Sequence, residues 1–240
     1  MISVLTPSIR EGGLDMVEKC LKRQTFQDFE WLVSTPYNAP EWAIQVGTTP
    51  KGDYHYALNR DWNRLYRKAQ GELIVNIVDL LWFPPDVLQK FWDHYLANPK
   101  ALVTAIGHQY STEENGKYEV KVWHDPRARL DQGSFYEIFP NDMEMCLCSI
   151  PTQAIYDCGG LDEEFDQYSA MSEKEMCYRM DKLGYSFYID QGMEYRALQH
   201  GRIGGTEEWD KHYFAGQDYY QQCLREISQG KRLKLNYVSK

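Results

Sequence analysis

The sequence lacks the long apolar run that a membrane-spanning helix requires. No stretch of its 240 residues approaches about 20 consecutive apolar residues. It also lacks the basic, then apolar, pattern of a secretory signal peptide, because Met1 leads directly into the strand-like residues 2–5. We therefore expect a soluble cytoplasmic protein with no transmembrane segment.

Paired cysteines with metal-ligand spacing are absent as well. The chain holds no CxxC pair, and the spacing of Cys146 and Cys148 has no second half that would complete a zinc site. The cysteines stand at positions 20, 146, 148, 158, 177 and 223. We expect these thiols to be reduced and mostly buried.

An excess of basic residues is the third absence. The formal net charge of −9 argues against a broad electrostatic grip on nucleic acid, although it leaves room for a local basic patch. Aromatic residues, by contrast, make up 14% of the chain, and several lie in polar segments. Such aromatics suit stacking on sugars or bases, or amphipathic packing at a surface.

The hydrophobic content of 43% is enough for one substantial core. Residues 2–6 and 29–33 have the pattern of strands, and between them an apolar stripe over 14–24 recurs at helical spacing. The chain thus opens as strand, loop, helix and strand, which favours a parallel pair with a right-handed crossover. The later helices are expected at 56–69, 86–96, 173–183 and 207–228, and the later strands near 42–46 and at 71–79, 101–106 and 185–189.

Residues 107–145 differ from the rest, being polar, charged and weakly periodic. A segment of this kind inside a compact domain is usually a lid, a substrate loop or a mobile region. Its basic residues could face an anionic acceptor; they are Lys117, Lys121, Arg127 and Arg129.

Asp79 ends a mostly β-branched run that opens at Gly71 and is followed by Pro84 and Pro85. Such a run reads as a buried strand that stops abruptly, which places Asp79 at its carboxyl end. In open α/β sheets ligands bind at that edge, where a carboxylate can hold a divalent cation against a phosphate. The alternative is an acid that accepts hydrogen bonds in a turn.

Four motifs stand in a characteristic order along the chain. They are the strand and proline loop at 2–8, the QT-x-x-x-F-E turn at 24–30, the N-x(7)-GE passage from Asn63, and the GG-L-D-E-x-F run at 159–165 with the acidic helix start at 173–179. This order resembles the family-2 glycosyltransferases of the GT-A fold, over about residues 1–200. The acid pair that this family spaces as Asp-x-Asp is reduced here to Asp79 alone, since Leu80 and Leu81 follow it.

The resemblance implies an α/β fold of the GT-A (Rossmann-like) type: a mixed, mostly parallel sheet flanked by helices, in a single domain with a C-terminal helical extension. Residues 1–200 would form the glycosyltransferase domain, with a nucleotide-sugar half at about 1–106 and an acceptor half at 107–200. Residues 201–240 would form the helical tail.

The implied activity is inverting glycosyl transfer from a nucleotide-sugar donor to an acceptor hydroxyl. A divalent metal, Mn²⁺ or Mg²⁺, would offset the growing charge of the diphosphate, with Asp79 and His200 as its candidate ligands. Glu173 matches the family's general base, and a position at a helix start would help keep it anionic. Glu175 is the alternate base, or else an ion-pair partner of Arg179 four residues on.

The resemblance also suggests residues for the two substrates. Asp162 and Glu163 would organise or contact the acceptor. The candidate donor-binding residues are Pro7, Ser8, Arg10, Asp53, Arg60, Asn63 and Trp82. Many relatives read the base with an Asp pair after the second strand; this chain has Ser34 and Thr35 there, so the pattern does not indicate uracil.

Two other classes of function stay open on the sequence. The loss of the second acid is compatible with a GT-A-like domain that binds a sugar or nucleotide without chemistry. A nucleotidyltransferase would use a metal on phosphates in a related architecture, but the chain lacks the Gly-rich, lysine-bearing opening that such enzymes often show. The acceptor is unidentified: a glycan, a lipid-linked sugar or, as a minority alternative, modified DNA.

Overall fold

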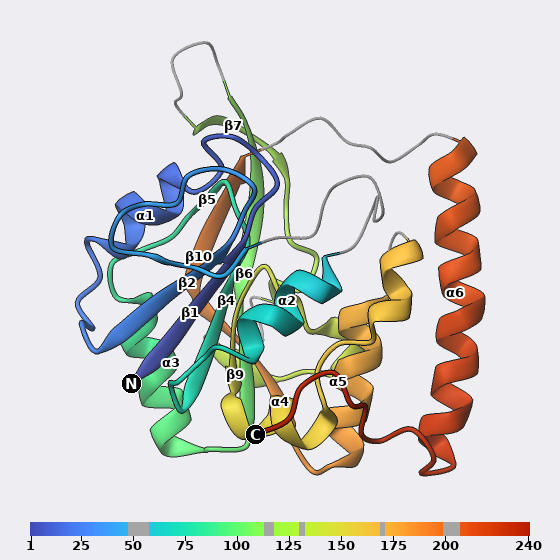
Figure 1. Ribbon diagram of the computed structural model, residues 1–240. Coiled ribbons are helices and arrows are strands. Elements are labelled where there is room, and N and C mark those ends of the chain that lie inside the picture. The colour runs from blue at the N-terminus through green and yellow to red at the C-terminus, as the bar shows by residue number, and fades with distance from the viewer. Residues whose placement is uncertain (48–57, 113–117, 130–132, 169–170, 199–206) are drawn as a thin grey trace.

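The computed structural model describes residues 1–47, 58–112, 118–129, 133–168, 171–198 and 207–240 (Figure 1). The strands are β1 Ile2–Pro7, β2 Phe29–Ser34, β3 Ile44–Gln45, β4 Leu73–Ile77, β5 Leu81–Trp82, β6 Ala101–Thr112, β7 Tyr118–Trp123, β8 Phe135–Glu137, β9 Leu147–Pro151 and β10 Ser186–Leu198. The helices are α1 Asp15–Leu21, α2 Asn59–Tyr66, α3 Val87–Ala97, α4 Thr152–Cys158, α5 Ser172–Lys182 and α6 Glu207–Ser228, with short 3-10 turns η1 Pro140–Asp142 and η2 Glu163–Gln167.

The strands form one mixed sheet in the order β3-β2-β1-β4-β9-β6-β10-β5, with β7 on β6 and β8 on β10. The pairs β1/β2, β1/β4 and β6/β10 are parallel. Strand β9 lies antiparallel between β4 and β6, so these two neighbours of β9 run in the same direction. The carboxyl ends of β1, β4, β6 and β10 therefore meet at one edge of the sheet.

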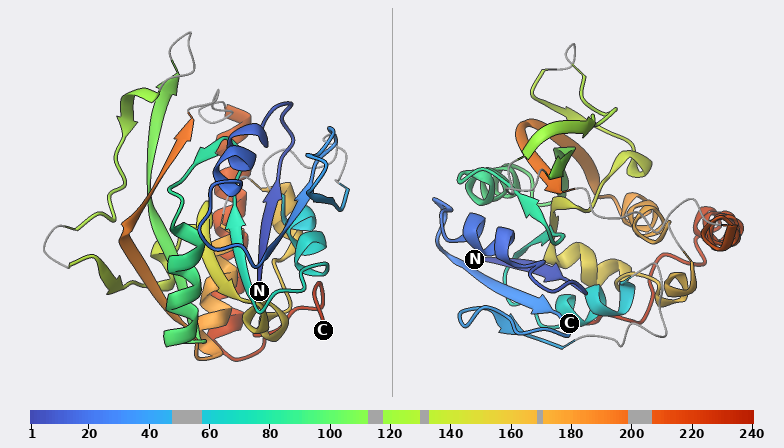
Figure 2. Two further views of the ribbon diagram at one scale, coloured as in Figure 1. Left: turned by 90° about the vertical axis from the view of Figure 1, so that its left-hand side faces the viewer. Right: turned by 90° about the horizontal axis from the view of Figure 1, so that it is seen from above.

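Helices cover both faces of this sheet (Figure 2). Because successive strand residues point to opposite faces, Val4 and Val75 enter a core under α1 and α3, whereas Leu5 and Ile74 enter a second core under α2, α4 and α5. Helix α6 lies outside the second layer and packs on η2 and α5 through a small cluster around Tyr220. Among the described residues, no helix is long and apolar enough to cross a membrane.

The opening β-α-β unit, the strand before Asp79 and the helix at 207–228 were predicted from sequence, and the structure confirms them with ends shifted by a few residues. The predicted loop character of residues 107–145 was wrong in part. Strand β6 continues to Thr112, and β10 continues to Leu198 beside it. These extensions carry polar residues on a paired ladder, which a search for apolar runs does not detect.

The basic residues of that segment differ from the expected anion-facing group. Arg127 is inside the fold: its side chain donates to Asp125, to the Ala105 carbonyl at 3.2 Å and to the Asp142 carbonyl at 3.1 Å. The pKa of Asp125 is lowered because Arg127 and backbone N–H groups outweigh its burial. Arg127 thus anchors the segment to β6. The side chains of Lys117 and Lys121 lie outside the described residues.

Candidate functional site

A pocket of about 380 Å³ opens at the carboxyl edge of the sheet. Strand ends and the loops that follow them supply most of its wall, and α2 closes one side. Its lining residues are Pro7, Arg10, Leu58, Trp62, Val78, Asp79, Gln109, Cys146, Ala197 and Leu198. The predicted donor and metal residues Pro7, Arg10 and Asp79 thus lie together, as expected for strand-end residues of parallel strands.

Asp79 is the only acid among the described lining residues, and it is paired with Arg10. The Arg10 NH1 group donates to Oδ1 at 2.8 Å and to Oδ2 at 2.9 Å of the carboxylate. The Ser8 hydroxyl donates to Oδ2 at 2.7 Å. Asp79 is only 8% exposed, so its carboxylate is buried. Both carboxylate oxygens nevertheless have donors, the Arg10 guanidinium and the Ser8 hydroxyl.

The backbone at Gly13 and Leu80 allows the Ser8 hydroxyl and the Asp79 carboxylate to lie close together. A Cβ at Gly13 would lie 2.5 Å from the Ser8 hydroxyl and 2.9 Å from Asp79 Oδ2, so only glycine leaves room for the pair. The Leu80 amide donates to the Gly13 carbonyl at 3.0 Å, and Leu80 has the unusual φ of 57°. The end of β4 is therefore tied to the loop that carries Arg10.

A second pocket of about 240 Å³ also has Arg10 in its lining. It is lined by Arg10, Gly12, Gly13, Leu14, Asp15, Glu18, Thr35, Tyr37, Asn38, Ala39 and Pro40. Tyr37 is 41% exposed, so its ring offers a stacking surface beside polar side chains. Arg10 lines both pockets and links them.

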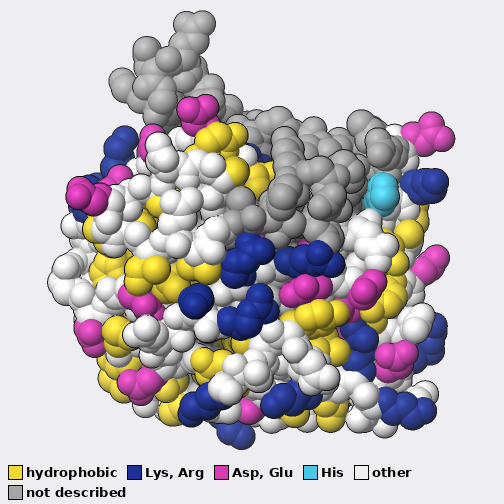
Figure 3. Space-filling model, in the orientation of Figure 1, with side chains coloured by type: hydrophobic (Ala, Val, Ile, Leu, Met, Phe, Trp, Pro, Cys, Tyr) yellow, Lys and Arg dark blue, Asp and Glu magenta, His cyan; other side chains and the backbone are white. Residues whose placement is uncertain are grey.

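Helix α2 presents two different faces to the site. Leu58 and Trp62, four residues apart, face the larger pocket. Arg60 and Asn63 instead contact η2 and the loop before it: Asn63 exchanges two hydrogen bonds with the Leu161 backbone at 2.8 and 2.9 Å, and Arg60 pairs with Glu163 at 3.3 Å. Arg60 and Asn63, expected at the donor, thus join Glu163 of the predicted acceptor loop. Lys and Arg side chains gather on the face of the molecule over α2 (Figure 3).

Asp166, which sequence reasoning did not single out, holds the start of α2. Its carboxylate accepts from the amides of Asn59 at 2.8 Å and Arg60 at 3.3 Å. Burial raises the pKa of Asp166 to about 7, against the opposing effect of these two amides. The loop before α5 is therefore coupled to the helix that walls the pocket.

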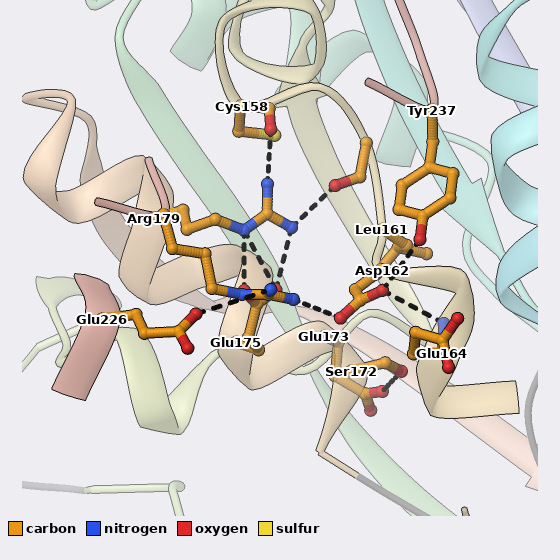
Figure 4. A network of polar contacts seen from close by, with 12 residues as sticks. Cys158, Leu161, Asp162, Glu164, Ser172, Glu173, Glu175, Arg179, Glu226 and Tyr237 are labelled. Atoms are coloured by element: carbon orange, nitrogen blue, oxygen red, sulfur yellow. Dashed lines mark hydrogen bonds and ion pairs between the residues drawn. The ribbon is translucent and has the colours of Figure 1, made fainter. Parts of the chain in front are cut away.

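The acid pair expected in α5 is divided between two environments. Glu175 is fully buried and accepts from Arg179 at 2.8 Å and from Arg232 at 2.9 Å, so the pairing with Arg179 is what the structure shows (Figure 4). Asp162, also expected at the acceptor, joins the same network: Arg232 and the Tyr219 hydroxyl donate to it. Glu175, Asp162, Arg179 and Arg232 thus form a buried ion-pair network with a structural role.

Glu173 has no hydrogen bond or ion pair to the network of Glu175, Asp162, Arg179 and Arg232 in the described part of the chain. It stands in the first turn of α5, after Met171 in the left-handed conformation, and its carboxylate accepts from the Ser172 hydroxyl at 3.4 Å (Figure 4). Its charge adds to burial in raising the pKa of Glu144, and it also raises the pKa of the pocket residue Cys146. Glu173 is not among the described residues that line the larger pocket, and its charge acts on the lining residue Cys146 in addition to burial and Glu144.

The predicted metal site has one ligand among the described residues, namely Asp79. No group of three His, Cys, Asp or Glu side chains capable of holding an ion occurs in the described part of the chain. His200 and the donor candidate Asp53 lie outside the described residues. The donor set that the described residues provide, one ion-paired carboxylate, does not fit a divalent cation that prefers several oxygen ligands.

Trp82 has a packing role in β5. It rests on the first core cluster, and the Arg196 guanidinium lies 5.0 Å from its ring. It is not among the residues that line either pocket at Arg10. Trp62, and not the predicted Trp82, is the tryptophan that lines the larger pocket. The sequence gives no local signal for this, because it depends on where α2 packs.

The chain is similar in structure to TarS residues 1–349 from S. aureus, a GT-A-like glycosyltransferase whose crystal structure was determined in complex with UDP. The TM-score is 0.60 at 11% sequence identity, and the match covers 82% of this chain and 60% of the TarS chain. No protein-family model and no curated protein matches the sequence. The likeness shows the fold: this chain has a GT-A-like fold, as its motifs predicted.

Proposed function

We propose that this protein is an inverting glycosyltransferase that moves a sugar from a nucleoside diphosphate sugar to an acceptor hydroxyl. One observation carries the proposal: Arg10 lines each of two pockets at the carboxyl edge of a GT-A-like sheet. A single cation between two cavities suits a ligand whose charged diphosphate joins two bulkier ends.

Each end of such a donor has a matching pocket. The base enters the smaller one, where Tyr37 offers a ring and Thr35 and Asn38 offer polar groups. The sugar enters the larger one, whose 380 Å³ is within the roughly 300–1,000 Å³ common for ligand sites. There Trp62 provides an apolar ring for the sugar face, and the diphosphate lies at Arg10.

Glu173 is the proposed general base. It takes the proton of the acceptor hydroxyl while the hydroxyl oxygen attacks the anomeric carbon from the face opposite the diphosphate. The bond between that carbon and the diphosphate oxygen breaks, the nucleoside diphosphate leaves with the bonding pair, and the proton stays on Glu173. One displacement inverts the anomeric configuration.

The binding-module alternative has one observation in its favour. Glu175 and Asp162, two of the acids expected to serve the acceptor, are buried in ion pairs with Arg179 and Arg232. Of the two acids predicted as the general base, Glu173 and Glu175, only Glu173 would then be available for chemistry. The two functions differ in whether a bound nucleotide sugar is consumed.

The test incubates the full chain with a panel of UDP and GDP sugars, and measures nucleotide release and sugar products by NMR. Glu173→Gln should lower turnover about 100-fold or more, because a positioned base typically contributes that much. Glu72→Gln, an acid-to-amide change at a 68% exposed side chain at the opposite end of β4, should match the parent. Tight nucleotide binding without any turnover would favour the binding module, and full turnover by Glu173→Gln would overturn the base.

A further inference from the structure

The proposed function creates a charge requirement that this pocket meets in an unusual way. A nucleoside diphosphate leaving group gains negative charge as the glycosidic bond breaks, and a cation or hydrogen-bond donor must stabilise it. Among the described residues that line the larger pocket, Arg10 is the one cationic side chain and Asp79 the one acid. Their geometry decides which of the two faces the phosphates.

The place of a second metal-binding acid is taken by core residues. An Asp-x-Asp pair that includes Asp79 would need its other acid two residues away, at position 77 or 81. Ile77 and Leu81 stand there, both fully buried in the first core cluster. The other polar side chains in the described part of this lining are the Gln109 amide and the Cys146 thiol, and a thiol is a poor ligand for hard cations such as Mg²⁺.

Arg10 already occupies the carboxylate that a cation would need. Its NH1 group lies within 2.9 Å of both Asp79 oxygens, and Ser8 occupies one of them as well at 2.7 Å. The Arg10 side chain is 37% exposed, whereas that of Asp79 is 7% exposed. The guanidinium is therefore the more accessible partner of the pair, and it reaches both pockets.

We propose that Arg10 takes the place of the divalent cation, so that this chain binds its diphosphate donor without metal. The inference rests on the proposed function and deepens it. Asp79 is then a positioning residue that holds and orients the guanidinium, with Ser8 and Gly13 fixing the carboxylate. A guanidinium suits this task because its planar donor groups match phosphate oxygens.

The test is calorimetric titration of the full chain with UDP and GDP, in EDTA and again in MnCl₂. The variants are Arg10→Gln, Arg10→Lys and Asp79→Asn, and the matched control is Arg23→Gln, an exposed arginine at the end of α1. We expect parent affinities in EDTA and in MnCl₂ to agree within about twofold. Arg10→Gln should weaken binding about tenfold or more, because a charge-assisted hydrogen bond contributes about that factor.

Arg10→Lys should recover part of the loss, since it keeps the charge but not the planar donor geometry. Asp79→Asn should weaken binding less than Arg10→Gln and should not create a need for Mn²⁺. Binding that requires Mn²⁺, or Arg10→Gln that binds as the parent does, would overturn the inference while leaving the proposed function intact. If neither nucleotide binds under any condition, the inference and the proposed function fail together.

Discussion

Replacing Arg232 with methionine removes one of two positive charges that balance two buried carboxylates. Glu175 and Arg179 have fully buried side chains, the side chain of Asp162 is 2% exposed, and that of Arg232 is 15% exposed. Arg232 approaches both acids and comes from the segment that follows α6. The change therefore leaves a buried net charge of −1 where the four side chains previously summed to zero.

The expected loss of stability depends on the hydrogen-bond donors that Glu175 and Asp162 keep in Arg232→Met. Removing one partner of a buried ion pair costs about 3–5 kcal/mol, because the other charge stays buried without compensation. Arg179 still donates to Glu175, and the hydroxyls of Tyr219 and Tyr237 still donate to Asp162 at 2.8 and 3.2 Å. We therefore expect a loss near the lower end, about 3 kcal/mol in the free energy of unfolding.

Urea denaturation followed by tryptophan fluorescence measures this loss, with Arg225→Met as the control on the exposed side of α6. The control should change stability by less than about 0.5 kcal/mol. Adding Asp162→Asn to Arg232→Met restores charge balance, and asparagine can still accept from the Glu164 amide that Asp162 now caps. The double variant should therefore lose at least about 1 kcal/mol less than the sum of the two single variants.

Two results would refute this reasoning. A loss below about 1 kcal/mol for Arg232→Met would mean that the network does not constrain the fold. Strict additivity with Asp162→Asn would mean that Arg232 and Asp162 do not act on each other.

Three further changes test other parts of the structure. Asp166→Asn should alter the pH dependence of stability. In the parent, burial raises the pKa of the Asp166 carboxyl from 3.8 to about 7, so the folded state binds more protons than the unfolded state between these pH values. The free energy of unfolding of the parent therefore falls as the pH rises through this interval. The stability of the variant relative to the parent should increase by about 1.4 kcal/mol per pH unit there in urea titrations, and parallel profiles would contradict this. Gly159→Ala should lower the stability by at least about 2 kcal/mol, because its Cβ would lie 1.7 Å from the Leu235 carbonyl at a φ of +78°. An unchanged urea midpoint would contradict the packing of the segment after α6 on α4, where the Leu235 amide donates to the Cys158 carbonyl at 2.9 Å. Gly13→Ala should weaken UDP binding in calorimetry about tenfold by displacing Ser8 and Asp79, and parent-like affinity would show that their geometry is not needed for the nucleotide.

Local pattern was sufficient for the opening unit of the fold and for the strand that ends before Asp79. The QT motif also has a structural reason: the Gln24 amide donates to the Pro84 carbonyl at 2.8 Å, and its oxygen accepts from Leu88 at 3.0 Å. Strand β9 was missed because a five-residue buried run has no alternation, and its antiparallel place between β4 and β6 is a non-local pairing.

The candidate site could be predicted only where strand ends define it. Pro7 ends β1, Arg10 follows β1 and Asp79 follows β4, so the parallel arrangement of these strands brings the three residues together. No local signal connects Asp162 with Arg232, 70 residues later, or marks Trp62 as the aromatic residue of the pocket. These contacts depend on how helices pack on the sheet.

The configuration of the transferred sugar tests the central claim most directly. Proton NMR of the anomeric signal, recorded while the parent chain consumes its nucleotide sugar, reports this configuration before the product equilibrates. We predict a product whose anomeric configuration is opposite to that of the donor. Retention of configuration, or no turnover of any nucleotide sugar in the panel, would contradict it.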